Sequence, residues 1–148
     1  MALLATIMAL AAPSLGRSLR GRNLDQEAKR LIALIEYGRS EAISQGVPMT
    51  VWIDAAGGRF GVEPKPGYPA ASQREKTYAL NPDVHFEMGS TAPTAQDVTT
   101  GVEFAPDGTP DASSIASVRL VDRFNSSVAI AKSRDGLSYD IVKEEPQK

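Results

Sequence analysis

The chain has 148 residues and a formal net charge of −2, with 16 basic and 18 acidic side chains. This length fits one domain with a leading helix, and the near balance of charge gives the whole chain no field that would attract nucleic acid or an acidic membrane surface. The absence of cysteine excludes disulfides and thiolate metal sites without assigning a compartment.

The beginning of the chain is predicted to be helical and changes polarity along its length. Residues 1–15 are apolar on all sides, and a basic joint at residues 16–23 follows them. Fifteen apolar residues are too few to span a bilayer, which needs about 20. A secretory signal peptide is a second interpretation, since residues 9–11 (Ala-Leu-Ala) imitate a cleavage site, but the segment lacks the basic residues that open such signals.

Residues 23–46 are predicted to form an amphipathic helix, because their apolar positions repeat with a helical period. One narrow stripe carries the residues expected to pack on a sheet: Leu24, Ala28, Leu31, Ile35, Gly38 and Ala42. Glu27 and Arg39 flank the stripe and are expected to lay their stems along the core edge with their charges in water. Asn23 is a candidate N-cap, and Gly46, closely followed by a proline, predicts the helix end.

After the helix the sequence changes to short alternating runs, which indicate β-strands. Strands are expected at residues 49–54, 59–63, 77–80, 84–88, 102–104, 115–121, 127–131 and 137–142. Loops are expected at 64–72, which is rich in proline, and at 89–100, which is small, polar and expected to be mobile. Neither a helix nor a sheet can bury its apolar face without packing against another element. We therefore predict an α+β fold with antiparallel sheets wrapped on the helix.

No group of residues in the sequence indicates catalysis or a metal site. His85 is the single histidine and alternates with apolar neighbours, so a surface position on a strand is expected. Asp97, Asp107 and Asp111 are loop carboxylates, and turn geometry alone explains the Asp-Gly pair at 107–108. The sequence has no glycine elbow and no phosphate-binding loop. It predicts a protein that is not an enzyme and has no catalytic residue, no cofactor and no bound metal.

The segment YGRSEAISQGVPMTVWID, which joins the amphipathic helix to the first strand, resembles the GspH/FimT class of type II secretion pseudopilins and type IV minor pilins. The resemblance covers residues 1–63 and returns at residues 102–108. It implies a pilin-like fold, with one long N-terminal helix packed against antiparallel sheets. Members of this class begin with a glycine cleavage point and a Phe-Thr-Leu-x-Glu run, which this chain lacks. If Pro13 matches the proline of the pilin membrane helix, we expect a preceding segment to be missing, through a misplaced start codon or a trimmed chain.

The resemblance also implies a function. The protein would be a structural minor pseudopilin of a type II secretion pseudopilus that supports protein export. Residues 1–22 would form the hydrophobic helix segment and joint, and residues 23–148 the globular domain. Helix packing against other pseudopilins or pilins would involve these residues: Leu3, Leu4, Ile7, Leu10 and Pro13. A single pass would hold the chain in the bacterial inner membrane with its domain in the periplasm, and a prepilin peptidase would be a further partner if the missing leader exists.

The alternative is a type IV minor pilin of the FimT class that binds DNA for uptake. Lys132, Arg134 and Lys143 are basic residues late in the chain, but acidic residues are interleaved with them. Phosphate contacts need a concentrated positive patch, so nucleic acid is not an expected partner. A secreted binding module, cleaved near residues 11–14, is a third hypothesis.

Overall fold

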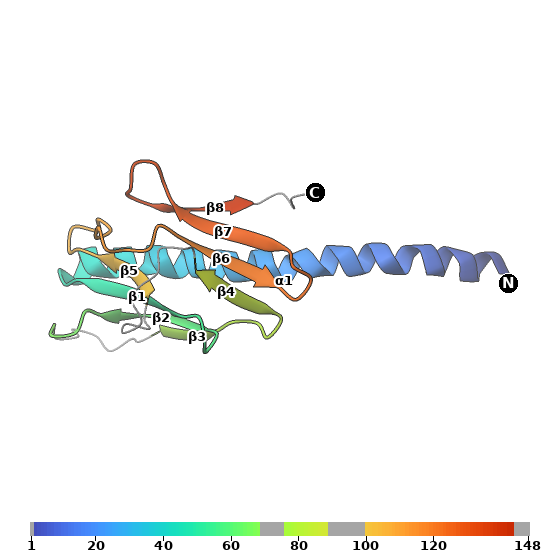
Figure 1. Ribbon diagram of the computed structural model, residues 1–148, viewed down its shortest axis with the longest axis horizontal. Coiled ribbons are helices and arrows are strands. Elements are labelled where there is room, and N and C mark those ends of the chain that lie inside the picture. Colours follow the sequence, from blue (N-terminus) through green and yellow to red (C-terminus); the bar gives the residue numbers. More distant parts are fainter. Residues whose placement is uncertain (1, 69–75, 89–99, 144–148) are drawn as a thin grey trace.

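The computed structural model describes residues 2–68, 76–88 and 100–143, with residues 2–20 and Thr100 described by their backbone alone. Within these residues, one helix, α1 (Ala2–Gln45), precedes eight strands (Figure 1). The strands are β1 (Met49–Asp54), β2 (Arg59–Pro64), β3 (Lys76–Ala79), β4 (Val84–Met88), β5 (Thr100–Phe104), β6 (Ser117–Asp122), β7 (Ser127–Lys132) and β8 (Tyr139–Lys143). Each expected strand overlaps one of these. Of the two expected loops, residues 69–72 of the first and 89–99 of the second lie outside the described residues.

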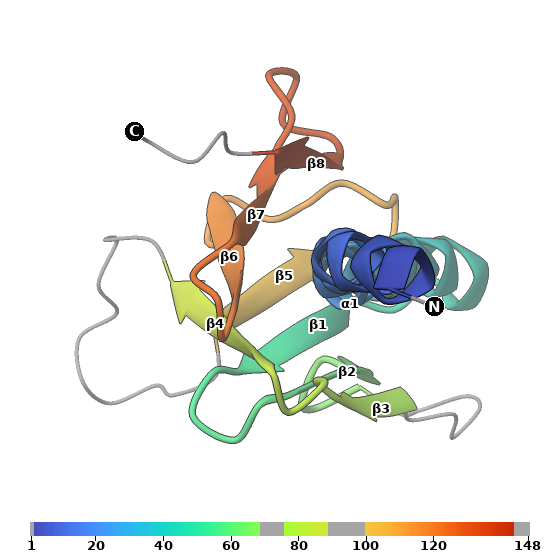
Figure 2. The same ribbon diagram turned by 90° about the vertical axis from the view of Figure 1, so that its right-hand side faces the viewer.

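The strands form two antiparallel four-stranded sheets. Their orders are β3-β2-β1-β5 and β4-β6-β7-β8. Seen along the helix axis, the first sheet lies beneath α1 and the second lies beside it, so that the two sheets enclose part of its circumference (Figure 2). The predicted α+β architecture, with antiparallel sheets wrapped on one long helix, is confirmed.

Helix α1 is continuous through the expected joint. Its backbone runs through Pro13 and through Asn23 without interruption, so the expectation that Asn23 acts as an N-cap is wrong. The predicted end is confirmed: Gly46 has a φ of 65°, the left-handed conformation that glycine adopts without strain, and its N–H donates to the carbonyl of Ala42 at 3.0 Å. No helix in the described part of the chain combines the length and apolar character needed to cross a membrane.

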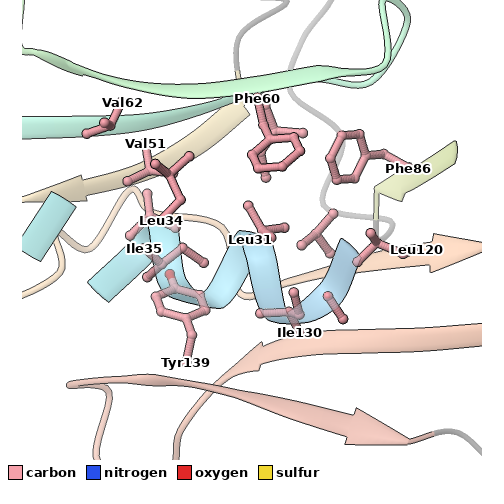
Figure 3. Packing of buried hydrophobic residues seen from close by; sticks show 14 of the residues in the cluster. Leu31, Leu34, Ile35, Val51, Phe60, Val62, Phe86, Leu120, Ile130 and Tyr139 are labelled. Atoms are coloured by element: carbon pink, nitrogen blue, oxygen red, sulfur yellow. The ribbon is translucent and has the colours of Figure 1, made fainter. Parts of the chain in front are cut away.

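The core lies where the C-terminal half of α1 meets both sheets. Figure 3 shows Leu31, Leu34 and Ile35 pointing from the helix toward side chains of the surrounding strands. Above them in that view lie Val51 and Phe60 of the first sheet, and Ile130 and Tyr139 of the second sheet lie on the other side. One stripe of α1 therefore fills the space between the sheets and covers an apolar face of each, so that no second helix is required to bury them.

Candidate assembly helix and the cleft beside it

The first candidate site is the N-terminal half of α1, which projects beyond both sheets (Figure 1). The residues expected to mediate assembly lie on this part of the helix: Leu3, Leu4, Ile7, Leu10 and Pro13. Their side chains fall outside the described part of the chain, so their role in assembly stays a prediction. The backbone alone places them on the segment of α1 that extends away from the domain.

The second set of residues anchors the helix to the domain. Leu24, Ala28, Leu31, Ile35 and Ala42 are each 3% exposed or less. From the first to the last of them the helix rises by about 27 Å, so the anchored stretch takes up most of the C-terminal half of α1. Gly38 lies in the same stripe and lets the helix approach β1, because a Cβ placed there would lie 2.7 Å from Cγ2 of Val51.

Glu27 departs from the expectation of a wet charge. Its side chain is only 7% exposed, and both of its carboxylate oxygens accept hydrogen bonds from Nη1 of Arg30, at 2.8 and 3.1 Å. The side chain of Arg30 is 43% exposed, and its guanidinium also lies over the rings of Tyr78 and Phe60, 5.1 and 5.8 Å from their centroids. An arginine one helical turn away therefore satisfies the buried carboxylate in place of water. The other flanking residue, Arg39, is partly buried.

A cleft opens beside this ion pair, between α1 and β3. Its volume is about 300 Å³, and it is lined by Arg30, Ala33, Leu34, Tyr37, Lys76 and Tyr78. Lys76 places its Nζ 3.8 Å from the centroid of the Tyr37 ring, a second cation–π contact beside that of Arg30. The sequence alone does not predict this cleft. The positions of Arg30, Ala33 and Tyr37 on one helix face could be read from their spacing, but their meeting with β3 depends on the tertiary fold.

The polar residues singled out in the sequence have local partners. His85 is exposed on β4, with Nε2 3.8 Å from Glu87. Asp107 accepts hydrogen bonds from the N–H and the hydroxyl of Thr109, and these bonds lower the pKa of the carboxyl. Asp111 likewise accepts hydrogen bonds from the N–H and the hydroxyl of Ser113, and these bonds lower the pKa of its carboxyl. Asp97 lies outside the described residues. Among the residues that are described, no group of three His, Cys, Asp or Glu side chains could hold a metal ion.

The late basic residues do not converge on one patch. Lys132 ends β7 opposite Tyr139, whereas Lys143 lies opposite Val128 at the other end of the same strand pair. Arg134 is exposed in the hairpin that joins the two strands. The length of β8 therefore separates Lys143 from the other two positive charges.

A long helix with one face packed across two antiparallel sheets defines a pilin-like protein. Residues 27–136 match the protein family described as type II transport protein GspH, and the chain therefore belongs to the GspH family.

Two solved structures share the fold at low sequence identity. One is the minor pseudopilin EpsH from the type II secretion system of Vibrio cholerae, with a TM-score of 0.61 and 12% identity over 86% of this chain and 98% of that chain. The other is the type IV minor pilin FimU of Pseudomonas aeruginosa, with a TM-score of 0.58 and 19% identity over 86% and 92% of the two chains. A comparison with curated protein sequences finds no match.

Proposed function

We propose that this protein is a structural minor pseudopilin of a type II secretion pseudopilus, which acts by assembling with other subunits and performs no chemistry of its own. The observation that supports this most directly is the GspH family match over residues 27–136. Membership in that family fits a place in a periplasmic pseudopilus. The projecting half of α1 offers a surface for assembly that is separate from the part that anchors the domain.

The apolar start of α1 suits a subunit that moves from membrane to filament. Side chains that are apolar on all sides exchange lipid for neighbouring helices at little hydrophobic cost, because both surroundings are apolar. Leu3, Leu4, Ile7 and Leu10 would then pack against the helices of neighbouring subunits, and Pro13 would adapt the helix to them. Before assembly the same segment would hold the chain at the inner membrane, with the domain in the periplasm.

Site-specific crosslinking tests this proposal, because the chain has no cysteine of its own. Leu10→Cys on the projecting part of α1 is produced in the native host beside single-cysteine variants of the other pilin-like subunits. Membranes are then oxidised, and mixed disulfides are identified by mass spectrometry. We expect crosslinks from Leu10→Cys to other subunits of the secretion system.

The matched control is Ser44→Cys, which lies on the same helix and is exposed on the domain side. Ser44→Cys should give few crosslinks, or crosslinks to other proteins than those captured by Leu10→Cys. Equal crosslinking of both variants, or crosslinks from Leu10→Cys only to unrelated membrane proteins, would contradict assembly through the projecting half of α1.

The second candidate is a type IV minor pilin, which the fold shared with FimU favours. The same crosslinking separates the two functions, because the captured subunits would then belong to a type IV pilus. DNA binding by such a pilin would appear as salt-dependent retention of the full chain on DNA. The double variant Lys132→Ala, Arg134→Ala should weaken that retention, and unchanged retention would exclude these two residues as the DNA contact.

A further inference from the structure

Among the described strands, β3 forms one edge of its sheet, and half of its backbone groups have no partner strand there. It follows β2 in the order β3-β2-β1-β5. The N–H of Leu80 donates to the carbonyl of Gly58 at 2.8 Å, and hydrogen-bonded pairs alternate along an antiparallel ladder. The backbone groups of Tyr78 and Lys76 therefore bond to β2. Those of Thr77 and Ala79 point to the opposite side, which no described strand occupies. An edge of this kind is a template for an added strand.

The cleft beside β3 adds a chemical preference to this edge. Alternation along the strand places Lys76 and Tyr78 on the face toward α1, where both line the cleft, and leaves Thr77 exposed. Glu27 balances the charge of Arg30. None of the carboxylates in the described ranges forms an ion pair with Lys76, whose contact is the Tyr37 ring. Within the described residues, the cleft therefore holds one positive charge without a carboxylate partner, next to an edge of β3 that no described strand pairs.

Lysine on an edge strand can also prevent unwanted strand pairing. Here the ammonium group of Lys76 lies over a helix side chain rather than across the open backbone of β3. It leaves the edge accessible, and it would repel a second copy of β3, which brings a lysine of its own. The charge thus discourages self-pairing and favours an acidic partner.

We propose that β3 and the cleft bind an extended acidic segment of a partner protein by strand addition. The partner backbone pairs with Thr77 and Ala79. The partner residue opposite Tyr78 shares its face, so its side chain enters the cleft, and a carboxylate there reaches the ammonium of Lys76. This inference does not depend on which secretion or pilus system the protein serves.

The test uses the full chain in detergent and a short blocked peptide in which two Glu residues alternate with Thr. Calorimetry measures its affinity, and amide chemical shifts locate the contact. We expect saturable binding, with shifts at Thr77 and Ala79. The same peptide with Lys in place of both Glu residues should bind about tenfold more weakly or not at all.

Two variants separate the contribution of the Lys76 charge to binding from that of the β3 backbone. Lys76→Glu should weaken binding of the Glu peptide by about tenfold or more, whereas Lys143→Glu, at an exposed lysine on the edge strand β8 of the other sheet, is the matched control and should leave binding unchanged. Thr77→Pro removes a backbone donor that β2 does not use, so it should abolish binding while the remaining amide spectrum stays intact.

Three results would overturn the proposal. They are failure of the Glu peptide to bind, equal binding of the Lys peptide, and unchanged binding in the folded Thr77→Pro protein. The second result would make the edge a general strand acceptor without charge recognition, and the third would move the contact away from the backbone of β3.

Discussion

At the scale of single residues, removal of Arg30 should destabilise the protein more than removal of the charge on Glu27, because Glu27 is buried and Arg30 is partly exposed. Arg30→Met keeps apolar contact with the Tyr78 ring but leaves the buried carboxylate of Glu27 without a cation. We expect a loss of about 2 kcal/mol in the free energy of unfolding, less than for a fully buried pair because Arg30 is 43% exposed. Glu27→Gln leaves a guanidinium that water can reach, and it should cost about 1 kcal/mol or less.

Urea unfolding of both variants and of their combination provides the measurement. Because the two residues share one interaction, the double variant should be more stable than the sum of the two single losses predicts. Strict additivity, or a larger cost for Glu27→Gln than for Arg30→Met, would contradict this view of the pair.

Tyr139 predicts how stability changes at alkaline pH. Burial raises the pKa of Tyr139 from 10.0 to about 12, opposed by a hydrogen bond with Ser114, and its hydroxyl donates to the carbonyl of Ile115 at 2.7 Å. Between these two pKa values the unfolded chain loses the proton that the folded chain keeps. Unfolding then releases a proton, so the contribution of Tyr139 to stability is complete below pH 10 and is lost as the pH rises toward 12.

The comparison is Tyr139→Phe against the unchanged chain, by urea unfolding at mildly and strongly alkaline pH. At the lower pH the variant should be less stable by about 1 kcal/mol, the value of a lost hydrogen bond. That difference should shrink at the higher pH. Tyr68→Phe, at an exposed tyrosine, is the control for general alkaline effects. A difference between Tyr139→Phe and the unchanged chain that stays constant with pH would contradict the linkage.

At the scale of elements, Gly38 sets how closely α1 approaches β1. Gly38→Ala places a Cβ 2.7 Å from Cγ2 of Val51, so the helix or the strand must move. Overpacking typically costs about 1–3 kcal/mol, and alanine returns about 0.5–1 kcal/mol through helix propensity. We expect a net loss of about 1 kcal/mol in the free energy of unfolding. Gly21→Ala, on the same helix with no atom within 4 Å of the new Cβ, should be neutral or stabilising.

The secondary structure was largely predictable because periodicity reports it directly. The helical stripe from Leu24 to Ala42 and the strand positions follow from repeats of 3.6 and 2 residues. The same patterns do not reveal which polar neighbours meet in space. Glu27 was expected in water because spacing alone does not tell that Arg30 folds back on it under the ring of Tyr78. Asn23 does not act as the expected N-cap, because α1 continues through it and a local capping signal is weaker than continuation of the helix.

The candidate sites were predictable to different degrees. The apolar residues at the start of α1 could be selected from composition and from the resemblance to minor pilins, and their role in assembly remains a prediction. The cleft could not be selected, since Tyr37 and Lys76 are far apart in the sequence and each is ordinary in its own element. Only the position of β3 beside α1 brings the two together.

At the scale of the whole molecule, the described core begins at Leu24, well after the projecting part of α1. Removal of residues 1–20 should therefore leave the domain folded, with a melting temperature within a few degrees of that of the full chain. Scanning calorimetry of both chains in the same detergent measures this. A drop of ten degrees or more would mean that the projecting segment contributes to domain stability. Detergent binding, by contrast, should be lost with the segment.

The long anchored stretch of α1 also has a mechanical consequence. A pull on the N-terminus along the helix axis loads the contacts between Leu24 and Ala42 in shear, so that they resist together along about 27 Å. A pull on the C-terminus instead loads β8, an edge strand whose ladder can open one residue pair at a time. The domain should therefore resist a force applied through its helix, and it should unfold at a lower force when pulled from its C-terminus.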